Sequence, residues 1–404
     1  MPADPESASS ERVTNGEATS VPGPVLAGWL EPDRHAWAFS HFEEVVNTAL
    51  IGHGTGPVRP LPAEPDKGLD SMALGVPGSP TLSMAEFLAR TSTDSVVVLS
   101  GGKLVFERYF GEAAPDRRHV LMSISKSIGA VAAGCLAADG MLDLAAPVAS
   151  YVPELTDSAY GSATVSQLLD MTASVCYSQD YLDPASEVQT QDRAAGWRDR
   201  RPGDPADSRE FLATLAPDGR HGDVFWYCSA TTDALSWVVE RASSTPYAEL
   251  VSQRVWSRIG AAHPAAISID QSGNPYACAG IAATAQDLAR FGLGVLEAIH
   301  AETGRHPWPH VFFQDTRRGG SLAAVAGHDF SALHPAGSYR NQWWVPGDES
   351  GSLLGIGIFG QYLWLDPVRD VVIVKLSSQA GPLDDRGLHD AAMAAIARLA
   401  ADRP

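Results

Sequence analysis

Residues 121–140 read LMSISKSIGAVAAGCLAADG, and this stretch gives the clearest fold signal in the chain. After the serine–lysine pair, apolar residues recur at the spacing of one helix face, at Ile128, Val131, Ala132, Cys135 and Leu136. Gly140 is typical of the residue that ends such a helix. The stretch therefore predicts a helix that begins near Ser123, presents one apolar stripe to a core, and stops before Gly140.

The start of this helix places a serine and a lysine three residues apart. Ser123 and Lys126 then share a helix face. A serine hydroxyl is a poor nucleophile until a neighbouring group takes its proton, and a buried amine or a phenolate can do so. Free backbone N–H groups at a helix start can also point at a developing oxyanion. We therefore predict that Ser123 is a nucleophile and Lys126 a proton-handling partner.

The Ser-x-x-Lys pattern is weak by itself, and a chance match is the alternative. Ser100-Gly101-Gly102-Lys103 also fits the pattern. These residues fall on a predicted Gly-Gly turn between two strands of residues 95–110, where the two side chains need not meet. The order of loop, serine and helix favours Ser123.

Two further segments are candidates for the same site. Tyr227 ends an aromatic, strand-like run before a helical pattern. Such a tyrosine is usually a core residue, but beside a Ser-x-x-Lys helix it is a candidate third catalytic group. Residues 355–360 read GIGIFG, and a Gly-rich strand allows close backbone approach to a site. An ordinary edge strand is the alternative for this segment.

The order of the remaining patterns predicts an α/β architecture. Strand-like runs at residues 95–110, 353–365 and 371–377, with a final Ala-rich helix over 388–400, predict one antiparallel sheet flanked by the terminal helices. Helical patterns at 165–171, 208–215 and 231–242 predict a helical region between the two ends of the sheet.

These patterns also suggest where the domains end. We expect an α/β domain formed by residues 25–145 and 295–404, a helical domain over 146–294, and a disordered polar extension over 1–24. Residues 189–207 are rich in Arg and Asp and predict a long, functional loop.

The charge balance indicates which partners to expect. The 404 residues carry a formal net charge of -19, which repels phosphate backbones. We therefore expect a small-molecule substrate and no nucleic acid. No apolar run reaches the roughly 18 residues of a membrane span, so no membrane partner is expected. The N-terminal stretch lacks the pattern of a secretory signal and predicts a cytoplasmic protein, with a homodimer left open.

The cysteines and histidines predict neither disulfides nor bound metal. Cys135, Cys176, Cys228 and Cys278 are widely spread and include no Cys-x-x-Cys pair, which favours reduced, mostly buried thiols. The 12 histidines include no His-Glu-x-x-His spacing. We expect no metal and no other cofactor.

Three motifs together resemble a known family. SISKS at 123–127, YCS at 227–229 and GIFG at 357–360 resemble the β-lactamase-fold serine hydrolases of the class C and esterase type. More closely, the chain is similar to the nylon-oligomer hydrolases over nearly everything after about residue 25. The longest distinctive match runs from Asp183 to Trp197. The resemblance implies a β-lactamase/transpeptidase-like fold.

The resemblance also implies roles for individual residues. Ser123, Lys126 and Tyr227 would be catalytic, and the backbone N–H groups of Ser123 and Ile358 would form the oxyanion hole. Tyr181 would hydrogen-bond the amide nitrogen of the substrate, and Asp192 would contact its free amino group. The remaining substrate-binding positions are Trp197, Tyr276, Cys278 and Trp344.

An alternative role for Asp192 is structural. It could pair with Arg193 or Arg198 and hold the loop, in which case it would not contact substrate.

The implied activity is hydrolysis of amides such as linear 6-aminohexanoate dimer, with short carboxylesters as side substrates. The main alternative is a carboxylesterase with little amidase activity. A β-lactamase is disfavoured, because Ser229 replaces the Asn of Tyr-x-Asn and Gly357-Ile358-Phe359 lacks the lysine of Lys-Thr-Gly. Cys278 and Phe359 also replace polar residues of the nylon-oligomer enzymes. A catalytically silent binding protein is disfavoured by the intact Ser, Lys and Tyr set.

Ser123→Ala should abolish labelling by a fluorophosphonate probe and lower turnover by several orders of magnitude, because no other serine is expected to be activated. Ser100→Ala, at the second Ser-x-x-Lys match, is the control and should leave activity intact. Persistent labelling of Ser123→Ala would show that the nucleophile lies elsewhere.

Overall fold

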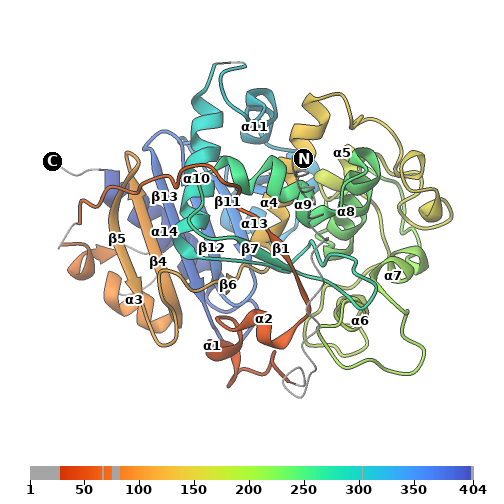
Figure 1. The fold of residues 1–404 in the computed structure, drawn as a ribbon, viewed down its shortest axis with the longest axis horizontal. Helices are drawn as coiled ribbons and strands as arrows, with labels where there is room; N and C mark the ends of the chain where they lie inside the picture. Colours follow the sequence, from red (N-terminus) through yellow and green to blue (C-terminus); the bar gives the residue numbers. More distant parts are fainter. Residues whose placement is uncertain (1–27, 66–67, 75–81, 303, 402–404) are drawn as a thin grey trace, which may run out of the picture.

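The computed structural model describes residues 28–65, 68–74, 82–302 and 304–401 (Figure 1). The predicted extension over residues 1–24 lies outside the described residues. Ahead of the main sheet, the described chain forms several short elements. These are α1 (His35–Ala38), α2 (Phe42–Val45), β1 (Thr48–Ile51), a 3-10 turn (Leu69–Ser71), β2 (Ala73–Leu74), β3 (Leu82–Ser83) and α3 (Met84–Arg90).

An antiparallel sheet of seven strands forms the central layer, in the order β5-β4-β13-β12-β11-β10-β9 (Figure 1). The strands are β4 (Thr93–Ser100), β5 (Lys103–Tyr109), β9 (Ser338–Arg340), β10 (Trp343–Val345), β11 (Leu353–Gly357), β12 (Gln361–Asp366) and β13 (Val371–Ser377). Strand β13 pairs with β4, so the two ends of the chain share one sheet. The predicted α/β architecture is confirmed.

The hairpin β4–β5 shows how local sequence sets this pairing. Its turn residues Gly101 and Gly102 have φ of 56° and 71°, the left-handed region that glycine adopts without steric cost. Lys103 lies at the surface, where its Nζ is 2.6 Å from Glu64. The second Ser-x-x-Lys match is therefore part of a surface turn.

Helices cover both faces of the sheet. Val97 and Leu99 belong to the core on the side of α10 (Ala285–His300), whereas Val96 and Val98 belong to the core on the side of α14 (Arg386–Ala401). All four side chains are fully buried. Because successive strand residues point to opposite faces, burial on both sides explains the uninterrupted apolar run of β4.

Helix α4 (Ile124–Ala138) joins the sheet to the helical region, since it packs against β11, α8 and α9. The helices of that region are α5 (Val165–Leu169), α6 (Glu187–Ala194), α7 (Ser208–Thr214), α8 (Ser229–Ser243) and α9 (Tyr247–Arg254). Three 3-10 turns accompany them, Val148–Ser150, Pro153–Leu155 and Trp256–Arg258. After α10, the chain forms α11 (His310–Arg318), α12 (Leu322–Val325) and α13 (Asp329–Leu333).

Residues 146–294 also contain two strands that the sequence did not indicate. Strands β7 (Ala265–Ser268) and β8 (Ile281–Ala283) form a second sheet with β1 and β6 (His119–Val120), in the order β1-β7-β8-β6. These strands are short and rich in alanine, so they show no period of two that could be read from the sequence. The proposed domain boundaries at 145 and 294 stay a prediction.

The predicted loop over 189–207 is wrong in its first part. Helix α6 covers Glu187–Ala194, and the Ser186 hydroxyl caps it by accepting a hydrogen bond from the Gln189 N–H at 3.4 Å. The helix was not recognised because it buries polar side chains, including Gln191 and Asp192, against polar partners. Hydrophobic periodicity, the usual signal of a buried helix face, is therefore absent.

Strand β11 runs unusually close to the loop before α4. A Cβ atom on Gly357 would lie 2.8 Å from the carbonyl oxygen of Leu121 and 2.9 Å from the Cβ of Met122. The close approach that a Gly-rich strand permits is thus present here. Only glycine at position 357 allows the strand to lie this near to Ser123.

Gly357→Ala should force β11 away from the loop at 121–123, lower the Tm, and slow fluorophosphonate labelling of Ser123. Overpacking of this kind costs about 1–3 kcal/mol. Gly56→Ala is a matched control, because no atom lies within 4 Å of a Cβ added there. Equal Tm values and labelling rates for both variants would contradict this view of the strand.

Candidate active site

Ser123 lies at the N-cap of α4 but does not cap the helix with its side chain. Its hydroxyl instead accepts a hydrogen bond from Lys126 Nζ at 2.9 Å. The preceding residue, Met122, has a φ of 48°, a left-handed conformation that is costly for a non-glycine residue and often found at functional sites. The structure therefore brings the predicted serine and lysine together.

Lys126 is buried, with 1% of its surface exposed, and each of its donors has an acceptor. Beyond Ser123, its Nζ donates to the carbonyl oxygen of Cys278 at 2.8 Å and to Ser229 Oγ at 3.4 Å. All three acceptors are uncharged oxygens. The ammonium or amine is thus oriented toward Ser123 without a direct ion pair among the described residues.

Tyr227 lies beside this pair, as predicted. Its ring centroid is 5.1 Å from Lys126 Nζ, and the ring stacks on Trp344 with 5.4 Å between centroids and an interplanar angle of 18°. Within the described residues, its hydroxyl forms no hydrogen bond with Ser123 or Lys126. The ring is held by its aromatic neighbours, so the hydroxyl is available to the cavity that Tyr227 lines.

Two cavities meet at Ser123. One has a volume of 610 Å³ and is lined by Tyr227 and Trp344, and the other has a volume of 340 Å³. The walls of the smaller cavity include most of the predicted substrate-binding residues. These are Tyr181, Asp192, Trp197, Tyr276 and Cys278. Ser123, Tyr181 and Ile358 line both cavities.

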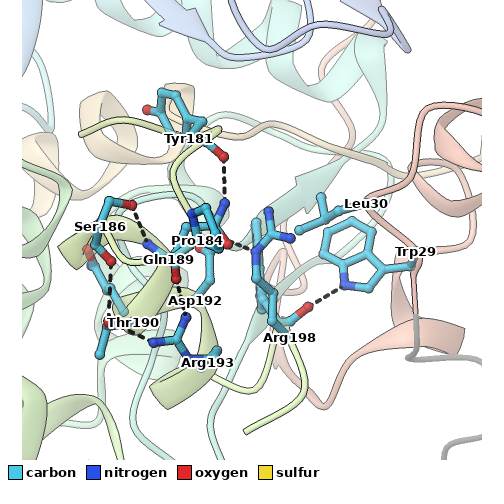
Figure 2. A network of polar contacts seen from close by, with 12 residues as sticks. Trp29, Leu30, Tyr181, Pro184, Ser186, Gln189, Thr190, Asp192, Arg193 and Arg198 are labelled. Carbon is cyan, nitrogen blue, oxygen red and sulfur yellow. Dashed lines mark hydrogen bonds and ion pairs between the residues drawn. The ribbon is translucent and has the colours of Figure 1, made fainter. Parts of the chain in front are cut away.

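Asp192 lies in α6 at the wall of the smaller cavity, within the polar network of Figure 2. Its carboxylate accepts hydrogen bonds from Arg198 Nε at 2.9 Å and from the Tyr276 hydroxyl at 2.7 Å. Burial raises the pKa of Asp192, and the positive charge of Arg198 opposes that shift. Of the two arginines considered from the sequence, Arg198 is the ion-pair partner, whereas Arg193 pairs with Asp204.

The smaller cavity also has aromatic and sulfur-containing side chains in its wall. Trp197 packs edge-on against Tyr276 with 4.7 Å between ring centroids, and its Nε1 donates to Ser268 Oγ at 2.9 Å. Burial raises the pKa of the Cys278 thiol well above its usual value, so this side chain stays protonated. Its backbone carbonyl, rather than its sulfur, contacts Lys126.

Within the described part of the chain, two backbone N–H groups at the cavity walls lack a hydrogen-bond partner. Among the described residues, the N–H groups of Ser123 and Ile358 donate to no acceptor, although both residues line the two cavities. Ile358 is held in the β11–β12 turn, where the next residue, Phe359, has a φ of 64° and donates its N–H to the Pro382 carbonyl at 2.9 Å. Unpaired donors at a cavity wall are suited to an anionic oxygen.

Sequence reasoning missed the residues behind the lysine. Asp233 in α8 is buried and accepts hydrogen bonds from the Cys278 N–H at 2.9 Å and from Gln191 Nε2 at 2.6 Å. Burial raises the pKa of Asp233 to about 7, and the charge of Lys126 opposes the shift. The only sign of this role in the sequence was that Asp233 is an acidic residue one helical turn after Ser229.

Comparison with known proteins agrees with this geometry. The sequence profile of the Beta-lactamase family matches residues 83–398. The chain belongs to this family. It is 44% identical over 366 residues to the 6-aminohexanoate-dimer hydrolase of Paenarthrobacter ureafaciens, a match that covers 91% of each chain. The resemblance inferred from the sequence motifs is confirmed, and the protein is an enzyme of the serine hydrolase type.

Two solved structures are similar to this chain in fold. A candidate 6-aminohexanoate-dimer hydrolase from Bacillus anthracis has a TM-score of 0.84 and 28% identity, with 95% of this chain and 98% of that chain covered. EstCE1, a hydrolase with promiscuous acyltransferase activity, has a TM-score of 0.59 and 17% identity, with 78% and 98% covered. The latter likeness concerns the fold alone.

Within the Beta-lactamase family, this site differs from the β-lactamase pattern where the sequence indicated. Ser229 occupies the third position of Tyr-x-Asn, and its hydroxyl still lies 3.4 Å from Lys126 Nζ. Residues 357–359 contain no lysine.

None of the helices in the described part of the chain is long and apolar enough to cross a membrane.

Proposed function

We propose that this enzyme is a serine amidohydrolase that cleaves the amide bond of 6-aminohexanoate dimer or of similar short ω-amino-acid oligomers, with side activity on short carboxylesters. The observation that supports this proposal most strongly is the contact between Ser123 and Lys126 at the junction of two cavities, one of which has a buried carboxylate in its wall. The name of the relative from Paenarthrobacter ureafaciens supports the substrate class.

In the first step, Ser123 Oγ attacks the carbonyl carbon and its proton passes to the Lys126–Tyr227 pair. Negative charge develops on the carbonyl oxygen, where the N–H groups of Ser123 and Ile358 can stabilise it. Both N–H groups are unpaired among the described residues, so no internal hydrogen bond has to break first.

In the second step, the carbon–nitrogen bond breaks and leaves an acyl group on Ser123. An amine is a poor leaving group until it is protonated, and the proton returns from the Lys126–Tyr227 pair. When the attack makes this nitrogen pyramidal, the Tyr181 hydroxyl would donate a hydrogen bond to the lone pair that the nitrogen acquires, and this bond gives way as the nitrogen takes the proton. Water then attacks the acyl ester by the reverse use of the same groups, which releases the acid and regenerates Ser123.

Substrate binding divides between the two cavities. The smaller cavity would hold the acyl half, because Asp192 is its buried carboxylate and a charge-assisted hydrogen bond would bind the substrate ammonium. Trp197 and Tyr276 would contact the methylene chain. Trp344 would contact the leaving half in the larger cavity, where its ring backs Tyr227.

The cellular setting belongs to the same proposal. The formal charge of -19 argues against a nucleic-acid partner, and the four free cysteines fit a reducing compartment such as the cytoplasm. Light scattering of the purified enzyme distinguishes a monomer from the homodimer that the sequence leaves open.

Tyr181→Phe should reduce turnover of 6-aminohexanoate dimer far more than turnover of p-nitrophenyl butyrate. An alkoxide or phenolate leaves without help, whereas the amine needs a donor as the bond breaks. The two kcat values of purified wild-type and variant enzyme test this difference. A wild-type enzyme that cleaves only the ester would instead identify a carboxylesterase.

Asp192→Asn should lower kcat/KM for the zwitterionic dimer and leave an uncharged ester nearly unaffected. Loss of a charge-assisted contact costs about 1.5–3 kcal/mol, or roughly 10- to 150-fold. Because the pKa of Asp192 is raised, the wild-type KM for the dimer should also increase as the pH falls and the carboxylate takes a proton. That increase should be missing in the variant. Equal losses on both substrates would mean that Asp192 serves only to hold Arg198.

A further inference from the structure

Gln179 connects the two halves of the active site that the mechanism treats separately. Its Nε2 donates to the Tyr181 hydroxyl oxygen at 2.7 Å and to Ser229 Oγ at 3.0 Å. Ser229 Oγ is also an acceptor for Lys126 Nζ. One amide group therefore touches both the tyrosine assigned to the leaving nitrogen and the serine that supports the lysine.

The orientation of this amide is set by a group that can only donate. The backbone N–H of Ser229 donates to Gln179 Oε1 at 3.0 Å. A backbone N–H has no acceptor capacity, so the amide oxygen must face it and the NH₂ group must face the two hydroxyls. Both hydrogens of the NH₂ group are then used, one on Tyr181 and one on Ser229.

This arrangement decides what the Tyr181 hydroxyl can do. A phenolic hydroxyl can accept and can donate one hydrogen. Because it accepts from Gln179, and because it donates to no acceptor within the described residues, its hydrogen is left for the cavities that Tyr181 lines. Burial also raises the pKa of Tyr181 well above its usual value, so the hydrogen is retained.

We propose that Gln179 is a positioning residue that fixes Tyr181 as a hydrogen-bond donor toward the leaving nitrogen and thereby sets the preference for amides over esters. The inference rests on the proposed amidase function. It adds that the preference depends on the direction of one hydrogen bond, since a residue that accepted from Tyr181 would turn the hydrogen away from the substrate. Gln179 does not itself touch the reacting atoms.

Gln179→Glu reverses that direction without changing the shape of the side chain. One carboxylate oxygen still accepts from the Ser229 N–H, but the other now accepts the Tyr181 hydrogen. The quantity to measure is the ratio of kcat/KM for 6-aminohexanoate dimer to kcat/KM for methyl 6-aminohexanoate, which has the same acyl group. At mildly alkaline pH, we expect this ratio to fall about 10-fold or more relative to wild type. The introduced charge also lies next to Ser229, which contacts Lys126, but its effect on the attack by Ser123 is common to both substrates and cancels in the ratio.

The pH dependence of the ratio separates positioning from structural damage. As the pH falls, the carboxylate introduced by Gln179→Glu takes a proton and can again donate to Tyr181, so the ratio should rise toward that of wild type measured at the same pH. Gln179→Met is the matched control, because its side chain has similar length and neither charge nor proton to titrate. Its ratio relative to wild type should not depend on pH.

A double variant completes the test. Adding Tyr181→Phe to Gln179→Glu should lower the ratio little beyond Tyr181→Phe alone, because both changes remove the same donor. An unchanged ratio in Gln179→Glu, or independent effects in the double variant, would overturn the role of Gln179 and leave the amidase proposal standing. A wild-type enzyme that cleaves the ester but not the dimer would overturn both.

Discussion

The hydrogen bond of 2.9 Å between Lys126 Nζ and Ser123 Oγ imposes requirements on much of the surrounding structure. A lysine with 1% exposure has lost its hydration, and its donors must find oxygen atoms within the protein. The Cys278 carbonyl and the Ser229 hydroxyl supply them. These acceptors come from two other parts of the chain, so the geometry of one short contact depends on how α4, α8 and the segment before β8 pack together.

Further buried residues hold these acceptors in place. The backbone N–H of Cys278 donates to the Asp233 carboxylate, and Gln191 Nε2 donates to the same carboxylate. A carboxylate therefore lies close to Lys126 without contacting it. On the opposite side, glycine at position 357 lets β11 approach the serine loop and brings Ile358 to the cavity. Catalytic geometry here is set by a buried polar network and by one very close backbone approach.

Several elements of the fold and the three candidate catalytic residues could be predicted from the sequence, because local patterns were sufficient to identify them. Helix α4, the β4–β5 hairpin and β13 follow from periodicity and turn residues, and Ser123, Lys126 and Tyr227 follow from their motifs. Strands β7 and β8 were missed because they are short, and α6 because its buried face is polar. Gln179 is oriented by Ser229, 50 positions away, and Asp233 binds the Cys278 N–H, 45 positions away. No local pattern reveals contacts over such separations.

The central claim is that Ser123 forms the acyl-enzyme, and trapping that species tests it most directly. With p-nitrophenyl butyrate, an activated ester, acylation should be fast and the acyl-enzyme should accumulate. Acid quenching during turnover, followed by proteolysis and mass spectrometry, should find one butyryl group on the peptide that contains Ser123. A butyryl group on another residue, or turnover with no acylated peptide, would contradict the account.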